Sequence, residues 1–81
     1  MKINVKLFAV ARDRAGTSAV EVELSPPTTI GRLRSALVEQ YPRLGDVVPH
    51  VRFAVNNEYA DDSTAIGGES EIAIIPPVSG G

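Results

Sequence analysis

The fold is decided by SPPTTIGRLRSALVEQYP, residues 25–42, where the spacing of the apolar residues changes from two to that of a helix. The apolar residues that would share one face of this helix are Ile30, Leu33, Ala36, Leu37 and Tyr41. Thr28 or Thr29 can cap the start of the helix, since a hydroxyl oxygen there accepts a hydrogen bond from a free backbone N–H. Pro42 ends the helix, because proline lacks an N–H and restrains the residue before it. The stretch therefore predicts one main helix with one apolar face.

Two segments before this helix alternate between apolar and polar residues, as half-buried strands do. They are KINVKLFAV, residues 2–10, and SAVEVEL, residues 18–24. Between them lies ARDRAGT, residues 11–17, which has room for one helical turn ending at Gly16. Because the connection is short, we expect the two strands to form an antiparallel hairpin.

The segments after the helix predict three more strands. RLGDVVPHV, residues 43–51, has no regular period, and a strand follows over Arg52–Val55. Asn56 and Asn57 then suit a tight turn into a short strand, since asparagine tolerates positive φ. The last strand lies within EIAIIPP, residues 71–77, and is apolar on both faces, which favours a central place in the sheet.

This order of elements predicts an α+β fold with about five strands in a mixed sheet and one main helix packed across it. The first and last strands carry the most apolar residues, so we expect them to be central neighbours. That arrangement is the β-grasp, or ubiquitin-like, roll. We expect it to span residues 1–75, with residues 76–81 as a projecting tail.

Composition excludes several classes of function. The 81 residues carry a formal net charge of −2, which argues against a nucleic-acid partner. There is no cysteine, so a thiol nucleophile and a thiolate metal site are excluded. The sequence has no apolar run of the roughly 18 residues that cross a membrane. It also has no signal-peptide core, and we expect a cytoplasmic location.

Most of the polar residues that could carry chemistry have simpler interpretations. His50 is the single histidine and has no second metal ligand near it in the sequence, so we interpret it as a loop residue. Asp61 and Asp62 are adjacent in a polar loop, where carboxylates form turns more often than catalytic pairs. Gly67 and Gly68 lack the Lys-Ser or Lys-Thr of a phosphate loop and are better read as a turn into the last strand.

Phe8 and Ile75 are the candidates for an interaction surface. Strict alternation places each of them on the face of its strand opposite the core residues. If the two strands are neighbours, both side chains form an apolar patch on the solvent face, and such patches mark interaction sites. A bulge that turns one of them inward is the alternative. Arg12 and Arg14, on either side of Asp13, belong either to a solvated turn or to a docking point for an acidic partner.

The tail, residues 76–81, has an unusual composition. Pro76 and Pro77 end the last strand and favour an extended, stiff chain. Val78 and Ser79 add one apolar anchor and one hydroxyl before Gly80 and Gly81. Two glycines would let the terminal carboxylate pass through a narrow channel into a catalytic pocket of another protein. The alternative is a frayed terminus without chemistry.

EIAIIPPVSGG, residues 71–81, resembles the carboxyl-terminal signature of the sulfur-carrier subunits of molybdopterin synthase, in the ubiquitin-like MoaD/ThiS family. The resemblance covers the whole chain. KLFAVARDRAG, residues 6–16, is similar to the first strand and turn of that family, with Phe8 and Arg12 included. The family's helix and Asn turn are matched by TIGRLRSALVEQYP and FAVNNEY, residues 29–42 and 53–59. One departure is GGES, residues 67–70, where the family often has Asp-Gly-Asp-Glu.

The resemblance implies a mechanism in which this chain is no enzyme on its own. An adenylyltransferase resembling ubiquitin-activating enzymes would use ATP to adenylate the carboxylate of Gly81, and a sulfur donor would convert it to a thiocarboxylate. The large catalytic subunit of molybdopterin synthase, in a heterotetramer, would then receive this end. The sulfur would pass to cyclic pyranopterin monophosphate. The implied partner contacts are Phe8, Arg12 and Ile75 together with the tail residues Pro76, Pro77, Val78, Ser79 and Gly80, and no cofactor or metal is bound by this chain itself.

Three other functions remain open at this point. The first is a sulfur carrier for another pathway, such as thiamine synthesis or tRNA thiolation. The second is a protein modifier joined through Gly81 to lysines of its targets, which predicts covalent adducts. The third is a plain interaction domain, for which deletion of Gly80 and Gly81 would change nothing.

Overall fold

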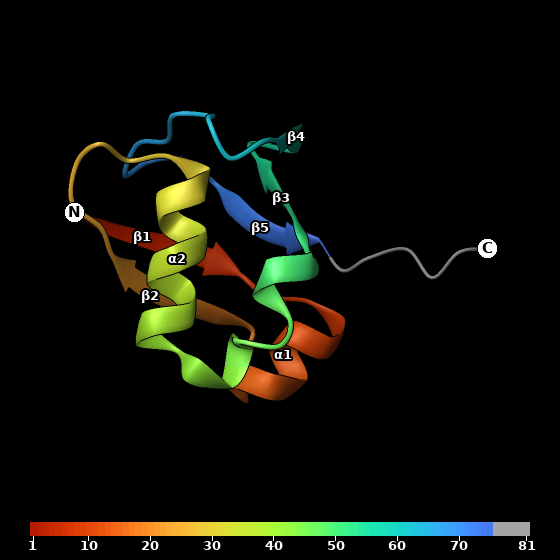
Figure 1. Ribbon diagram of the computed structural model, residues 1–81. Helices are drawn as coiled ribbons and strands as arrows, with labels where there is room; N and C mark the ends of the chain where they lie inside the picture. The colour runs from red at the N-terminus through yellow and green to blue at the C-terminus, as the bar shows by residue number, and fades with distance from the viewer. Residues whose placement is uncertain (76–81) are drawn as a thin grey trace.

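The computed structural model describes residues 1–75 of the chain, and Pro76–Gly81 lie outside the described residues. The elements are β1 (Lys2–Lys6), α1 (Ala9–Ala15), β2 (Ala19–Glu23), α2 (Ile30–Gln40), η1 (Pro42–Leu44), η2 (Val48–His50), β3 (Arg52–Val55), β4 (Glu58–Ala60) and β5 (Ile72–Ile75). The strands form one five-stranded sheet in the order β2-β1-β5-β3-β4. Helix α2 lies across one face of this sheet (Figure 1). The predicted α+β arrangement is confirmed.

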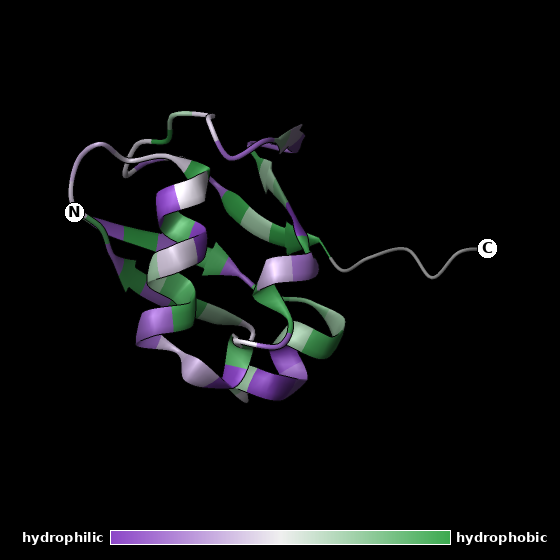
Figure 2. Ribbon diagram, in the orientation of Figure 1, coloured by the Kyte–Doolittle hydropathy of each residue, from purple (hydrophilic) through white to green (hydrophobic). Residues whose placement is uncertain are grey.

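The first and last strands are neighbours at the centre of the sheet, as the sequence predicted. β1 pairs parallel with β5, with Val5 beside Ile72 and Lys6 beside Ala73. β1 also pairs antiparallel with β2, which confirms the hairpin, and β3 pairs antiparallel with β5 and β4. Hydrophobic and hydrophilic bands alternate along the strands in Figure 2, because one face of the sheet packs on the helix and the other faces solvent.

The first strand is shorter than predicted, and the connection after it is longer than one turn. β1 ends at Lys6, and α1 has seven residues rather than a single turn. Ala11 is 1% exposed, so the helix buries an apolar side chain from the segment that was predicted to be a connection. Gly16 ends α1 as predicted, at φ 74°, with its N–H donating to the carbonyl of Arg12. Glycine suits this position because it has no Cβ to oppose a left-handed φ.

Helix α2 begins and packs as its sequence predicts. Thr29 is the N-cap, and its hydroxyl oxygen accepts from the N–H of Arg32 at 3.3 Å. Thr28, the other predicted cap, instead donates to the carbonyl of Ile66 at 2.8 Å. The buried residues of the helix are Ile30, Leu33 and Leu37. Pro42 does more than end the helix, because it begins the short helix η1.

The segment predicted to be irregular, residues 43–51, contains part of η1 and all of η2. Leu44 and Val48 are fully buried and close one end of the core. Three-residue 3₁₀ turns are too short to produce a readable apolar period, which is why the sequence pattern missed them.

Arg34 fastens this segment to the helix. One guanidinium nitrogen donates to the carbonyls of Val48 and Val51, at 2.7 and 3.0 Å. Nε and the other nitrogen donate to Asp62 Oδ1, at 3.2 and 3.1 Å. The guanidinium carbon also lies 4.9 Å from the ring centroid of Phe53. These contacts join α2 to the end of η2 and to the loop after β4.

The remaining turns agree with their sequence. Asn56 and Asn57 have φ values of 52° and 70°, and they form the predicted turn between β3 and β4. In the loop of residues 61–70, Gly67 and Ser70 close a turn through two mutual hydrogen bonds of 3.1 and 3.0 Å. That turn leads into β5, as predicted. Within residues 1–75, no helix combines the length and the apolar character that crossing a membrane requires.

We expect Leu37→Ala to lower the free energy of unfolding by about 2–5 kcal/mol, because it removes a fully buried side chain between helix and sheet. That loss is a large share of the ~5–15 kcal/mol that stabilises a small domain. Denaturant titration measures it. The matched control is Glu39→Ala, two positions along the helix and exposed, which should change stability by less than about 0.5 kcal/mol. Equal losses in both variants would contradict the described packing of α2.

Candidate functional site

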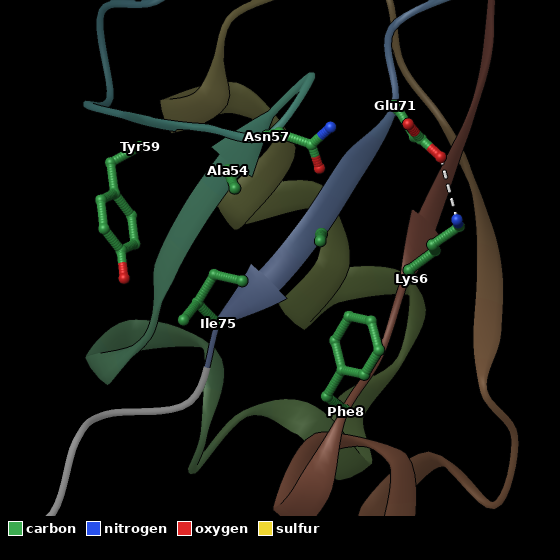
Figure 3. Close-up of a pocket in the computed structure, with 8 residues that line it drawn as sticks. Lys6, Phe8, Ala54, Asn57, Tyr59, Glu71 and Ile75 are labelled. Atoms are coloured by element: carbon green, nitrogen blue, oxygen red, sulfur yellow. Dashed lines mark hydrogen bonds and ion pairs between the residues drawn. The ribbon is translucent and has the colours of Figure 1, made fainter.

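A shallow groove of about 410 Å³ lies on the face of the sheet that α2 does not cover. Its lining residues come from both central strands and from the β3–β4 hairpin, and they are Lys6, Phe8, Ala54, Asn57, Tyr59, Glu71, Ala73 and Ile75. Figure 3 shows these side chains around the open surface of the sheet. The strand residues among them have the opposite parity to the core residues, as a period of two requires.

The floor of the groove is low because small side chains lie at its centre. Ala54 and Ala73 are paired across β3 and β5. Larger apolar side chains surround them. Phe8 is 46% exposed, Tyr59 is 60% exposed and Ile75 is half-buried. An exposed patch of large apolar residues around a small-residue floor is typical of a protein-docking surface.

The groove has a charged end and an apolar end. Lys6 Nζ and Glu71 Oε1 form an ion pair at 2.9 Å. Figure 3 shows this pair at one end of β5, while Phe8 and Ile75 lie toward the other. Both charged side chains are more than half exposed, so the pair contributes little to stability. It instead marks one end of the groove with polar groups.

Tyr59 is held in place by a neighbouring strand. The guanidinium carbon of Arg52 lies 4.2 Å from the centroid of the Tyr59 ring. Arg52 is on β3 and Tyr59 on the edge strand β4, so the contact crosses the hairpin. A cation over an aromatic face at this distance is attractive, by about 0.5–1 kcal/mol at an exposed site. The contact favours this position of the ring although most of the Tyr59 surface is in solvent.

The structure brings Phe8 and Ile75 into one groove, which confirms the predicted outward direction of both. Phe8 lies beyond the end of β1 and is the N-cap of α1. Its φ and ψ of −131° and 157° are still extended, so the alternation of β1 continues to this residue. The predicted place of Phe8 was therefore right, although the predicted strand was too long. That a partner binds these residues remains a prediction.

The other predicted partner contacts lie elsewhere. Arg12 is an exposed residue of α1 and does not line the groove. Its neighbour Arg14 instead pairs with Asp46 at 2.6 Å and ties α1 to the segment between η1 and η2. The remaining predicted residues, Pro76, Pro77, Val78, Ser79, Gly80 and Gly81, lie outside the described residues.

The residues interpreted as structural fit that interpretation. His50 is exposed at the end of η2. Asp61 accepts hydrogen bonds from the side chain and backbone of Ser63 and from the hydroxyl of Thr64, and these bonds lower the pKa of the Asp61 carboxyl. Asp62 pairs with Arg34. In residues 1–75, no group of three or more His, Cys, Asp or Glu side chains is placed to hold a metal ion.

Sequence reasoning missed Tyr59, Lys6 and Glu71 as parts of this surface. β4 has three residues, too few for alternation to indicate which side Tyr59 faces. The available signal was a large aromatic residue two positions after Asn57 of the turn. Lys6 and Glu71 are 65 residues apart, and it is the parallel pairing of β1 and β5 that brings them together.

This fold and this site define a small ubiquitin-like protein with an exposed apolar groove on a mixed sheet. The chain belongs to the ThiS family, whose model matches residues 5–81. It is 40% identical to the molybdopterin synthase sulfur carrier subunit of Mycobacterium tuberculosis, over 100% of this chain and 99% of that protein. The fold is the β-grasp of this family.

Two solved structures are similar to this chain in fold. The crystal structure of small archaeal modifier protein 1 from Haloferax volcanii has a TM-score of 0.82 and 32% identity, and each chain is covered completely. A complex of subunits 1 and 2 of the molybdopterin-converting factor from Helicobacter pylori has a TM-score of 0.69 and 20% identity, with 100% of both chains covered. The second likeness concerns the fold alone.

We expect Phe8→Asp to change the free energy of unfolding by less than about 0.5 kcal/mol, because the side chain is 46% exposed and lies outside the hydrophobic core. Circular dichroism and denaturant titration check this. The control is Phe53→Asp, which places a charge at a fully buried position and should prevent folding. If Phe8→Asp unfolds the domain as Phe53→Asp does, the outward direction of Phe8 is wrong.

Proposed function

We propose that this chain is a sulfur carrier in molybdenum cofactor biosynthesis, with the sulfur held as a thiocarboxylate on Gly81. The observation that carries the proposal is the 40% identity to a molybdopterin synthase sulfur carrier subunit across essentially the full length of both proteins. The apolar groove supports it, since a carrier must dock on the proteins that load and unload it. The chain supplies a docking face and a reactive end rather than catalytic side chains.

The first step activates a carboxylate that is a poor electrophile. One oxygen of the Gly81 carboxylate attacks the α-phosphorus of ATP, pyrophosphate leaves, and a mixed anhydride with AMP forms. ATP and the groups that stabilise this reaction belong to an adenylyltransferase that resembles ubiquitin-activating enzymes. Because the step consumes ATP, we place the cycle in the cytoplasm.

The second step exchanges AMP for sulfur. A donor that supplies sulfur at the oxidation level of sulfide attacks the carbonyl carbon, AMP leaves, and the thiocarboxylate remains. In the large subunit of molybdopterin synthase, this sulfur passes to cyclic pyranopterin monophosphate, and water restores the carboxylate. A dithiolene contains two sulfur atoms, so each product consumes two thiocarboxylates. That requirement is compatible with a heterotetramer of two carriers and two large subunits.

The groove is the surface that we assign to docking. Phe8, Tyr59 and Ile75 supply the apolar contacts, and Lys6 with Glu71 supplies a polar end. Ile75 is the last residue of β5, so a partner seated here also contacts the chain where the tail begins. In the proposal, Pro76 to Gly80 extend from this point into the partner's active site, and Arg12 contacts acidic groups beside it.

A protein modifier is the second candidate function. The observation that favours it is the match to small archaeal modifier protein 1, which is as complete in coverage as that to the sulfur carrier subunit. A modifier would use the same adenylate but pass the acyl group to a lysine amine, forming an isopeptide bond. A sulfur carrier for thiamine synthesis or tRNA thiolation is a third candidate within the same family. Intact mass of the native protein separates the sulfur carriers from a plain interaction domain, since a thiocarboxylate replaces one oxygen by sulfur. Covalent adducts with lysines would identify the modifier.

We expect removal of Gly81, or addition of one residue after it, to abolish ATP-dependent adenylation and dithiolene formation. The reason is that the reacting carboxylate is displaced, and a displacement of about 1 Å can cost on the order of a hundredfold in rate. Gly81→Ala keeps the carboxylate and should be milder than deletion, although the added methyl restricts φ. The assay combines the purified chain with the adenylyltransferase, ATP, a sulfide donor and the large subunit.

Thermal unfolding of the same variants is the control, because residues 1–75 hold the described core and should unfold unchanged. A variant without Gly81 that supports both steps at the normal rate would show that the sulfur-carrier proposal is wrong. Normal adenylation with no dithiolene product from the unaltered chain, but with lysine-linked adducts, would favour the modifier.

We expect Phe8→Asp to weaken binding to the large subunit by about tenfold or more, because it places a charge in the apolar part of the groove. The matched control is Val10→Asp, a nearby exposed position on α1 that does not line the groove. Titration calorimetry with both folded variants gives the comparison. Equal affinity for the two variants would exclude the groove as the docking surface.

A further inference from the structure

β2, Ala19–Glu23, is at one edge of the sheet. An edge strand directs a row of backbone N–H and C=O groups outward, and these groups can pair with a strand of another chain. The opposite edge, β4, has three residues and offers little length for pairing. β2 is therefore the edge at which unwanted strand addition has to be prevented.

The hydrogen bonds of the hairpin show which groups of β2 face outward. Ser18 and Leu24 pair with β1 neighbours, through Leu7 N–H to Ser18 O and Leu24 N–H to Met1 O, both at 2.8 Å. In an antiparallel pair, successive residues alternate between bonding the partner strand and pointing away from it. The odd-numbered residues of β2, which are Ala19, Glu21 and Glu23, thus direct their backbone groups away from β1.

Side chains from the end of α2 bind both outward groups of Glu23 and the outward carbonyl of Glu21. The Gln40 amide nitrogen donates to the Glu23 carbonyl at 2.9 Å, and the Gln40 amide oxygen accepts from the Glu23 N–H at 3.0 Å. The Tyr41 hydroxyl donates to the Glu21 carbonyl at 2.7 Å. Thr17, before the strand, donates its hydroxyl to the Ala19 carbonyl at 3.2 Å. A side-chain amide carries the same donor and acceptor as a peptide group, so Gln40 stands where the peptide of an added strand would stand.

The charges of β2 also disfavour pairing with a second copy. Glu21 and Glu23 are exposed and lie near Lys2 and the amino terminus, at 3.7 and 3.2 Å. Two copies of β2 paired about a twofold axis would bring these carboxylates opposite one another, and like charges in that position are destabilising. The hydrogen-bonded backbone groups of Glu21 and Glu23 and their acidic side chains therefore both oppose pairing of β2 with a second copy.

We propose that Gln40 and Tyr41 close the β2 edge against strand addition by a second copy of this chain, and thereby keep the chain monomeric. The proposal is independent of the sulfur chemistry, since it concerns the edge and not the groove or the tail. It gives Gln40, an exposed residue at the end of a helix, a role that neither core packing nor docking assigns.

The test separates the side-chain closure from the charge. Glu21→Gln/Glu23→Gln removes the charges and leaves Gln40 and Tyr41 in place. Adding Gln40→Ala and Tyr41→Ala to that background opens the edge. Sedimentation velocity is measured at protein concentrations up to about 1 mM, which covers weak association. Over this range we expect the double variant to stay a monomer and the quadruple variant to form a dimer. Hydrogen exchange in the dimer should slow at the amides of Glu21 and Glu23.

A quadruple variant that is folded by circular dichroism and monomeric at this concentration would overturn the proposal. Dimers of equal strength in the double variant would also overturn it, because charge alone would then close the edge. Tyr41→Ala removes a half-buried ring, so Gln40→Ala alone in the native background provides a second measurement. Its Glu23 amide should exchange at least about fivefold faster at low concentration, through loss of its acceptor. An unchanged exchange rate would show that Gln40 does not close the edge.

Discussion

The parallel pairing of β1 with β5 is the constraint on which the rest of the molecule depends. Its register sets Val5 beside Ile72 and Lys6 beside Ala73, a separation of 67 residues along the chain. The extended backbone of Phe8 continues this register and brings Phe8 level with Ile75. Parallel neighbours also need a long crossover, and here almost the whole chain supplies it. One pairing thus determines the centre of the sheet, the covered face and the outer groove.

The two faces of the sheet separate stability from recognition. Ile72 and Ile74 of β5 are fully buried against the helix side, while Ala73 and Ile75 of the same strand line the outer groove. Because successive residues of a strand face opposite ways, a side chain of the groove can change without opening a cavity in the core. This separation allows large apolar side chains to remain in solvent on a domain whose core is small. It also explains why the site has no buried titratable group: in residues 1–75, no polar or charged residue is buried.

Periodicity in the sequence was sufficient for the main helix, the central strands and the outward direction of Phe8 and Ile75. These features follow from repeated burial along four or more residues, which leaves a readable pattern. The features that were missed are local or depend on distant contacts. η1 and η2 have three residues each, and α1 follows β1 so closely that alternation masked its start. Tyr59 depends on its contact with Arg52, and the ion pair of Lys6 and Glu71 depends on strand order. The predicted roles of Arg12 and of residues 76–81 stay predictions.

The closed edge and the open face together restrict how a partner can bind. Gln40 and Tyr41 occupy the outward groups at the end of β2, and β4 is short, so added strands find little backbone to pair with. Exposed apolar side chains gather instead over the centre of the sheet, around Ala54 and Ala73. In the proposed docking, a partner is therefore directed onto the face, where side chains rather than backbone groups would make the contacts. Side-chain contacts discriminate between partners more strongly than a regular backbone ladder does, because a ladder accepts almost any extended sequence. The proposed carrier, which would be loaded by one protein and unloaded by another, needs that discrimination. It also needs to release each partner, and a shallow groove with one charged end permits this better than a continuous intermolecular sheet.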